Sequence, residues 1–367
     1  MMYIAISSAG EIVLSIFIAI IALMVMIMVH ESGHYLAGKL LKFKINEFSI
    51  GFGPKLFSKK SEKSGEVFSI RLIPLGGFCA FEGEDQESKV EGDFNGQKPW
   101  KRIVVLLAGV TFNFISALLI LTILFSTYGY TLPKVASLNE PVGIVAQGFR
   151  EGDIIYSVNG KKVYAVIETN IGTLLSEAED QTTAIVIRDG KKTEITICRA
   201  DFYSASTDED GNVKVQTYRG YGINIDYASY RMNVFESCGR SFVFIWQLVI
   251  LTFKTIGGIF TGAVGLKGSV GGTVTSVAAM GKVTMTLGFR GVLLMFGIMS
   301  ASVALMNALP FPALDGCRVI FVLIEWIFGK PINRKVEAII HTVGLIILFA
   351  FAIICDILNL GTIASLF

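Results

Sequence analysis

The sequence predicts a polytopic α-helical membrane protein with four transmembrane helices, a membrane-associated β-hairpin and one extracytoplasmic α+β domain. Hydrophobic residues make up 52% of the 367 positions and charged residues only 17%, with a mean hydropathy of +0.61. Such values lie outside the range of ordinary soluble domains. Long uncharged stretches recur in the first and last parts of the chain, and a charged, strand-like segment separates them.

Four uncharged stretches approach or exceed the length of about 20 residues that a helix needs to cross a bilayer. They are Ile12–Val29, Ile103–Phe125, Gly291–Leu314 and Ala338–Cys355. The first has no Lys or Arg before it and no small-residue cleavage site after it, so we expect a permanent anchor and not a signal peptide.

Positively charged residues orient these spans, because cytoplasmic loops are enriched in Lys and Arg. Lys39, Lys42 and Lys44 follow the first span, and Arg318 and Arg334 lie between the third and fourth. We therefore expect a plasma-membrane protein with both basic loops in the cytosol and both termini outside.

A fifth apolar segment, Phe242–Phe253, is bracketed by Arg240 and Lys254. Its uncharged length is short for a span, and its apolar residues recur at helical spacing, which favours a helix lying on the membrane surface. A fifth crossing would also move Asp315 to the membrane face opposite His34. We therefore predict a surface helix followed by a glycine-rich linker.

Two regions outside the spans are expected to fold. Between residues 131 and 230, Asn159-Gly160 and Asp189-Gly190 each follow a strand-like run, which is the pattern of β-hairpins in a compact α+β domain. Phe43–Phe57 and Glu66–Ile73 form a second strand pair. Its Gly51-Phe52-Gly53-Pro54 stretch is too apolar for a solvated loop, which predicts a re-entrant hairpin covered by protein.

These patterns divide the chain into four parts. Residues 1–127 form a first membrane half, 128–230 the extracytoplasmic domain, 231–290 the surface helix with its linker, and 291–367 the second membrane half. The net charge of +2 gives no reason to expect a nucleic-acid partner. The five cysteines include no CxxC pair, so neither a zinc ribbon nor a disulfide framework is expected.

The HExxH sequence His30-Glu31-Ser32-Gly33-His34 carries the chemistry. On a helix it places two imidazoles at i and i+4 on one face, where they can share a zinc ion, with Glu31 placed to deprotonate a water molecule. Two of the three histidines in the chain belong to this motif.

A catalytic zinc takes a third protein ligand, which is either His341 or a carboxylate. Asp315 is the better candidate because it ends the third span, and Pro310 and Pro312 must break the helix before it. A carboxylate within a span costs ~3 kcal/mol by insertion scales, so it usually has a function. His341 is more readily explained as a histidine in a helix interior.

The chain resembles the site-2 protease family of intramembrane zinc metalloproteases, in its bacterial branch with an extracytoplasmic PDZ domain. The resemblance covers nearly the whole chain. Besides the HExxH motif, it depends on four stretches, namely Gly51-Phe52-Gly53, Ala108-Gly109-Val110-Thr111-Phe112-Asn113-Phe114, the NxxPxPxLDG pattern of Asn307–Gly316, and Gly148–Ile155 with Asn159-Gly160.

The resemblance implies that His30, His34 and Asp315 bind Zn²⁺ and that Glu31 is the general base. It also implies substrate-binding roles for Asn307, Pro310, Pro312, Gly51 and Gly53. The expected activity is cleavage of single-span membrane proteins near the cytosolic side, such as anti-sigma factors or signal-peptide remnants, after an earlier site-1-type protease. The PDZ-like domain would control substrate access.

Some features depart from the family pattern. Val110 stands where the family usually has Pro, Cys317 where a second Gly is common, and only one PDZ-like domain fits, although some members have two. Parts of the sequence also fit two other classes, namely a catalytically inactive membrane PDZ scaffold that binds protein C-termini and a metal transporter. The complete His, Glu and Asp set argues against the first, and its clustering at one depth argues against the second.

Overall fold

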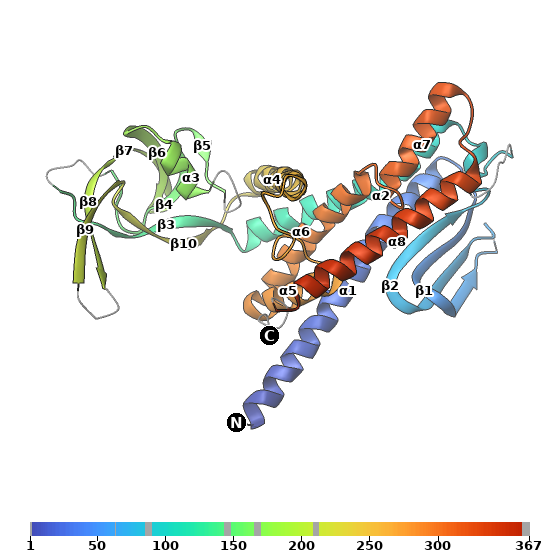
Figure 1. Cartoon of the computed structure of the whole chain (residues 1–367), viewed down its shortest axis with the longest axis horizontal. Helices are drawn as coiled ribbons and strands as arrows, with labels where there is room; N and C mark the ends of the chain where they lie inside the picture. The colour runs from blue at the N-terminus through green and yellow to red at the C-terminus, as the bar shows by residue number, and fades with distance from the viewer. Residues whose placement is uncertain are drawn as a thin grey trace. The chain divides into compact units, whose positions relative to one another are not determined.

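The computed structural model describes residues 2–62, 64–84, 90–142, 148–164, 170–207 and 213–361. The chain forms two compact units, Met1–Leu121 with Leu248–Phe367, and Thr122–Gln247. Figure 1 labels the helices and strands of both units.

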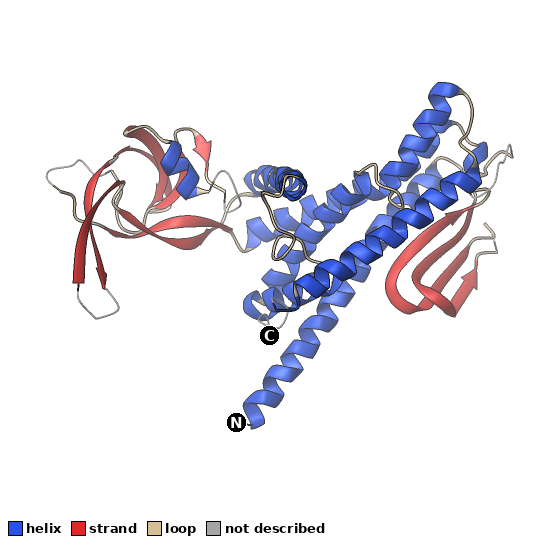
Figure 2. Ribbon diagram, in the orientation of Figure 1, coloured by secondary structure: helices blue, strands red, loops and turns tan. Residues whose placement is uncertain are grey.

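The first unit is mainly helical (Figure 2). All four predicted spans are helices: α1 (Met2–Leu40), α2 (Pro99–Thr127), α6 (Phe289–Ala308) and α8 (Arg334–Leu358). The third is shorter than predicted. It stops at Ala308 because Pro310 and Pro312 follow, and proline removes a backbone donor and clashes with the preceding turn.

Five helices are long and apolar enough to cross a membrane, and the fifth is α4 (Val234–Phe260). Its 27 residues extend well beyond the predicted Phe242–Phe253. The argument that this segment is too short to span was therefore wrong, because the helix continues through Arg240 and Lys254. The count of four spans stays a prediction.

Two helices were not predicted. Inside the expected linker, α5 (Thr273–Leu287) packs against α1, and Met280 is buried with Ala19 and Ala22. After the proline-containing turn, α7 (Asp315–Phe328) leads towards the loop before α8. Arg102 of α2 binds Glu325 of α7 at 2.9 Å, and Arg334 of α8 binds the same carboxylate at 3.2 Å.

The predicted hairpin consists of β1 (Ile45–Lys60) and β2 (Val67–Phe81), which pair antiparallel. Both strands bend. Residues 45–50 therefore pair with 77–81 on one side, and residues 47–50 pair with 67–70 on the other. Residues 55–60 pair with 67–71. Gly51 at the bend has φ +84°, and a Cβ there would lie 2.5 Å from the carbonyl oxygen of Ile73. A non-glycine residue is therefore excluded sterically at this bend.

The apolar stretch after Ile73 continues β2 and is not a loop, contrary to the predicted end of that strand. Residues 77–81 form one edge of the sheet, and residues 67–70 lie inside it. Among the described residues, the segment 77–81 thus pairs with β1 on one side only, and the Phe81 N–H donates to the Glu84 side chain.

The second unit contains the α+β domain. Its main sheet has the order β10-β3-β4-β6-β7, with β5 paired to β4. The strands are β3 (Tyr130–Leu138), β4 (Ile154–Val158), β5 (Lys161–Lys162), β6 (Gln181–Arg188), β7 (Lys191–Cys198) and β10 (Ile223–Tyr230), with helix α3 (Ile171–Glu177) after β5. A separate hairpin pairs β8 (Ala200–Thr207) with β9 (Val213–Gly220).

Both predicted tight turns are present in this domain. Asn159 and Gly160 have φ of +48° and +71°, and Asp189 and Gly190 have +51° and +76°. Positive φ at both central residues is the geometry that two-residue hairpins require. The buried Asp153 accepts hydrogen bonds from the Arg150 backbone and the Arg188 guanidinium, which orders the turn before β4.

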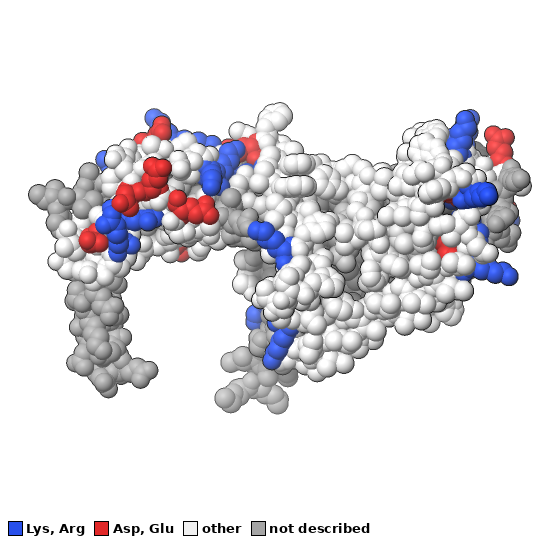
Figure 3. Space-filling view, turned by 45° about the horizontal axis from the view of Figure 1, so that its top comes forward, with Lys and Arg blue, Asp and Glu red and all other residues white. Residues whose placement is uncertain are grey.

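The surface of the helical unit agrees with a membrane location. In Figure 3, the charged side chains visible on this unit lie at its ends, and a wide stretch of its surface has none. Large apolar side chains such as Phe17, Leu119 and Phe349 are more than half exposed. Exposure of so many apolar side chains is typical of helices that face lipid.

Candidate metal centre

The two histidines of the HExxH sequence lie on one face of α1. His30 and His34 are each 7% exposed, and their ring centroids are 4.8 Å apart. The one-turn spacing follows from the helical period. Both imidazoles therefore face one point.

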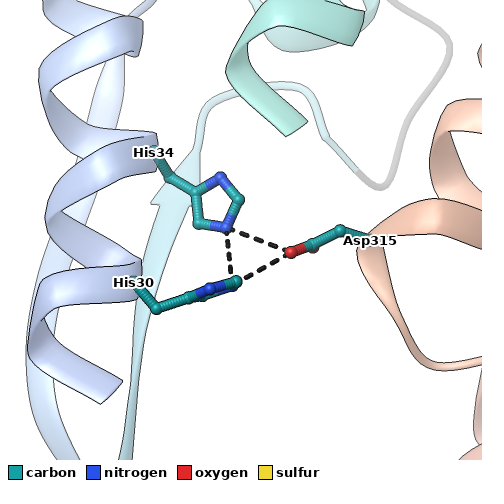
Figure 4. Close-up of side chains that lie close together, drawn as sticks. All are labelled: His30, His34 and Asp315. Carbon is teal, nitrogen blue, oxygen red and sulfur yellow. Dashed lines mark hydrogen bonds and ion pairs between the residues drawn. The ribbon is translucent and has the colours of Figure 1, made fainter. Parts of the chain in front are cut away.

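Asp315 approaches the same point from the first turn of α7. The helix break at Leu309–Leu314 turns the chain, so the carboxylate points back to α1 (Figure 4). An acidic group in the first turn of a helix also interacts favourably with the helix dipole.

The three side chains form a compact triangle of donor atoms (Figure 4). His30 Nε2 lies 3.0 Å from Asp315 Oδ2 and 3.1 Å from His34 Nε2, and His34 Nε2 lies 3.4 Å from Asp315 Oδ2. This is a group of His and carboxylate donors that could hold a metal ion.

The triangle fits zinc. Ligand atoms about 2.0–2.1 Å from one tetrahedral ion are separated from each other by about 3.3 Å. The observed sides of 3.0–3.4 Å match this separation. Two imidazoles and one carboxylate also form a donor set of catalytic zinc sites, which leaves one position for another ligand.

Small residues let α2 approach this face of α1. A Cβ at Gly33 would lie 2.5 Å from the carbonyl oxygen of Ala108, and one at Gly109 would lie 2.5 Å from His34 Nε2. The close approach places the carbonyl oxygen of Val105 2.8 Å from His34 Nδ1. Nδ1–H therefore donates to this carbonyl, and Nε2 keeps its lone pair for a metal.

Asn113 of α2 gives His30 the corresponding contact. It is fully buried, and its amide nitrogen lies 3.4 Å from His30 Nδ1, while its Oδ1 has no hydrogen-bond partner among the described residues. If His30 Nε2 binds a metal, Nδ1 carries the proton and needs an acceptor. Rotating the amide by 180° places Oδ1 at this position. The amide nitrogen and oxygen of asparagine have nearly the same shape, so the hydrogen-bond partner decides between the two orientations.

From the sequence, Asn113 was part of a motif without a predicted role of its own. The sequence signal that could have identified Asn113 was an amide side chain within an apolar span, one helical turn after Gly109. The partner of His34 could not have been found in this way, because Val105 contributes only its backbone.

A cavity of about 720 Å³ opens beside the donor triangle. Glu31 and Asn307 line it, as do residues 78–81 at the edge of the hairpin sheet. Gly77 lies close to Glu31, because a Cβ at Gly77 would be 3.6 Å from Glu31 Cγ. The cavity thus brings a carboxylate, an amide and a strand edge together at the metal centre.

Four other predicted residues lie outside the lining of this cavity, namely Gly51, Gly53, Pro310 and Pro312. Gly51 and Gly53 form the bend of β1, both with positive φ. The two prolines lie in the break before α7. Their structural roles are clear, and direct substrate contact by these four stays a prediction.

His341, the alternative third ligand, is not part of the triangle. It lines the cavity from α8, and its Nδ1 accepts a hydrogen bond from the backbone N–H of Ala313 at 2.9 Å. Of the two candidates that the sequence left open, the structure therefore brings Asp315 to the histidines.

The centre combines two buried histidines and one carboxylate with a neighbouring glutamate, and it lies on strongly apolar helices. These features are typical of a membrane-embedded metal-dependent hydrolase. Comparison with known proteins narrows the class. The model of Peptidase family M50 matches residues 18–351. The chain belongs to this family, the site-2 protease family, and is a zinc metalloprotease with several membrane helices.

Relatives extend over almost the whole chain. A protein of Fusobacterium nucleatum named "Putative zinc metalloprotease" is 33% identical over 345 residues, which are 93% of this chain and 96% of that protein. Proteins with the same description from Clostridium perfringens and Agrobacterium fabrum are 31% and 29% identical. They cover 93% and 91% of this chain, and the matches span 97% and 92% of those proteins.

Proposed function

We propose that this protein is an intramembrane endopeptidase that cuts the transmembrane segments of single-span membrane proteins near the cytosolic side. His30, His34 and Asp315 are its zinc ligands, and Glu31 is its general base. The observation that carries the proposal is the donor triangle with sides of 3.0–3.4 Å, next to a cavity that Glu31 lines.

Each residue of the site has a distinct task. Bound zinc supplies Lewis-acid chemistry, which activates water and polarises a scissile carbonyl. The Glu31 carboxylate accepts the proton of the attacking water and returns it to the leaving amine. The Asn307 amide, on the last turn of α6, holds the substrate backbone in the cavity.

The substrate must be locally extended, because a helix keeps its carbonyl groups in internal hydrogen bonds. Residues 77–81 are suited to receive such a segment by strand addition, since they form a sheet edge and residues 78–81 line the cavity. Residues 67–70 of the same hairpin are paired on both sides, so we expect the substrate segment at residues 77–81 and not there.

Four crossings explain the geometry of the site better than five. His34 near the end of α1 and Asp315 just after α6 lie within 3.4 Å, so α1 and α6 end at the same depth. The two helices then run in the same direction, with α2 returning between them. A crossing by α4 without a further return would separate these ends, which supports a surface location for α4 and an extracytoplasmic location for both termini.

The α+β domain of the second unit is PDZ-like and acts as a size filter. The Gly148–Ile155 stretch and the antiparallel sheet with a short helix support this assignment. Such a filter admits substrates whose outer domains a site-1-type protease has already removed. Anti-sigma factors and signal-peptide remnants are substrates of the expected type.

Cleavage of a model single-span substrate by purified protein in bilayers tests the proposal. Glu31→Gln should keep a full equivalent of zinc and lower the cleavage rate by about 10²–10⁴-fold, the usual contribution of a general base. Wild-type turnover by Glu31→Gln would exclude Glu31 as the base. Comparative proteomics of membrane fragments with the same pair of proteins would then identify natural substrates.

The strand-addition step has its own test, because Cys79 lies on the edge segment and lines the cavity. With the other four cysteines replaced by serine, single cysteines along the substrate should form disulfides with Cys79 at alternate positions of an extended segment. Cross-linking with a three- to four-residue period would indicate a helical substrate and contradict strand addition.

A further inference from the structure

His341 is the one histidine outside the metal centre, and it accepts a hydrogen bond from the loop that carries Asp315. Ala313 N–H donates to His341 Nδ1 at 2.9 Å, so in the neutral imidazole the proton is on Nε2. Nε2 is buried and has no hydrogen-bond partner in the part of the chain that the structure describes. The ring also packs edge-to-face on Phe321 of α7.

Ala313 has an unusual backbone conformation for a residue with a side chain. Its φ is +81°, in the left-handed region that glycine adopts readily and alanine does not. A strained residue persists only where its surroundings hold it in place. Ala313 lies two positions before Asp315, so its conformation sets the direction in which the chain delivers the carboxylate to the histidines.

A second contact from the same face of α8 holds the residue before Ala313. Gly344 follows His341 by three positions, and residues at i and i+3 share one helix face. A Cβ at Gly344 would lie 2.3 Å from Pro312 Cβ and 2.6 Å from the Pro312 carbonyl oxygen. The backbone of α8 therefore lies directly against Pro312, while His341 binds Ala313.

We propose that His341 is a positioning residue for Asp315, acting through the strained peptide of Ala313. The His341 Nδ1 atom accepts the hydrogen bond of the Ala313 N–H, and the backbone at Gly344 packs against Pro312. These two contacts with α8 stabilise the turn that brings Asp315 Oδ2 to the two histidines. This inference rests on the proposed role of Asp315 as a zinc ligand. It explains why a histidine that does not bind the metal lies in the cavity beside it.

Zinc affinity, measured by competition with a chelator on the full-length protein in detergent, is the readout. His341→Leu removes the acceptor and should weaken zinc binding about tenfold or more, as loss of supporting contacts around a metal site does. His341→Asn keeps an acceptor oxygen close to the place of Nδ1, so its zinc affinity should stay close to wild type. Equal losses in both variants would overturn the proposal.

A second variant separates positioning from a folding defect. Ala313→Gly accepts positive φ without strain, so combining it with His341→Leu should recover a large part of the lost zinc affinity. Ala313→Gly alone should bind zinc like the wild type. Failure of the double variant to exceed His341→Leu would contradict a role that acts through Ala313.

Asp315→Asn distinguishes the two levels of the argument. If Asp315→Asn binds zinc with wild-type affinity, the proposed ligand set itself fails. If Asp315→Asn loses zinc while His341→Leu keeps it, the ligand set stands and only the positioning role of His341 is excluded.

Discussion

Gly109 of α2 lies directly against the ring of His34, so closely that a Cβ at this position would be 2.5 Å from the histidine Nε2 atom. The same Cβ would lie 2.8 Å from His30 Nε2. The backbone of α2 at Gly109, where no side chain intervenes, thus forms one wall of the candidate metal site. Small residues at such interfaces are a general means by which membrane helices approach each other.

Gly109→Ala should therefore disrupt zinc binding, because the added methyl group occupies the space beside both Nε2 atoms. We expect zinc stoichiometry to fall well below one equivalent and cleavage to fall with it. Gly257→Ala, where a Cβ meets nothing within 4 Å, is the matched control and should retain zinc. Metal analysis of both purified variants checks this, and full zinc occupancy in Gly109→Ala would contradict the observed packing.

Asp315→Asn should lower both zinc content and activity. An amide oxygen is a poorer zinc ligand than a carboxylate and leaves the two imidazoles with a less stable third partner. We expect about a tenfold or greater loss of zinc affinity. Asp226→Asn in the α+β unit serves as control. Unchanged zinc stoichiometry in Asp315→Asn would return His341 to consideration as a ligand.

Asn113 offers a test of the hydrogen bond to His30. Asn113→Leu removes the acceptor for Nδ1–H and should weaken zinc binding by about 10–100-fold, the usual effect of losing such a partner. Asn113→Asp keeps an acceptor, so its zinc affinity should be about tenfold or more higher than that of the leucine variant. Thr111→Val on the exposed face of the same helix is the control, since the Thr111 hydroxyl donates to the Leu107 carbonyl in the preceding turn. Equal affinities in the leucine and aspartate variants would exclude the contact.

The hairpin sheet should lose stability in acid through Glu47. Burial raises the pKa of this carboxyl, but hydrogen bonds from Ser69, Arg71 and Lys55 outweigh burial and lower the pKa to about 2. Because the folded pKa lies below the unfolded value, the contribution is fully present above about pH 4.5 and is lost as the pH falls towards 2. Its size is about 2 kcal/mol after allowance for solvent screening.

Hydrogen exchange of β1 and β2 between pH 7 and pH 3 measures this effect, after correction for the intrinsic exchange rate. Protection should decline in the wild type as the pH approaches 3, and Glu47→Gln should remove most of this pH dependence while lowering protection at pH 7. An unchanged pH profile in Glu47→Gln would show that another group is responsible.

The local features of the fold could be predicted because each depends on neighbouring residues. The turns at Asn159-Gly160 and Asp189-Gly190 follow from the need for positive φ, and the four apolar helices follow from their uncharged length. The boundaries were less certain. α4 is longer than its uncharged core, because Arg240 packs against Tyr130, Tyr156 and Tyr164 within the second unit and its charge does not end the helix.

Other features could not be predicted because packing determines them. Helix α5 has modest hydropathy and many glycines before it, and it becomes part of the core only because α1 covers Met280. Likewise, the interior place of residues 67–70 in the sheet depends on the bend at Gly51, which lets β1 pair on both sides of β2.

The sequence by itself determined that two imidazoles and a glutamate share one turn of an apolar helix, since a helical period acts over a few residues. The tertiary structure decided that a carboxylate 285 positions after His30 lies beside both imidazoles, that Asn113 lies beside His30, and that His341 binds the loop before Asp315. The reason is physical. Contacts between distant segments form only when whole helices pack, and at this centre backbone carbonyls, missing Cβ atoms and one strained peptide determine how closely they can do so.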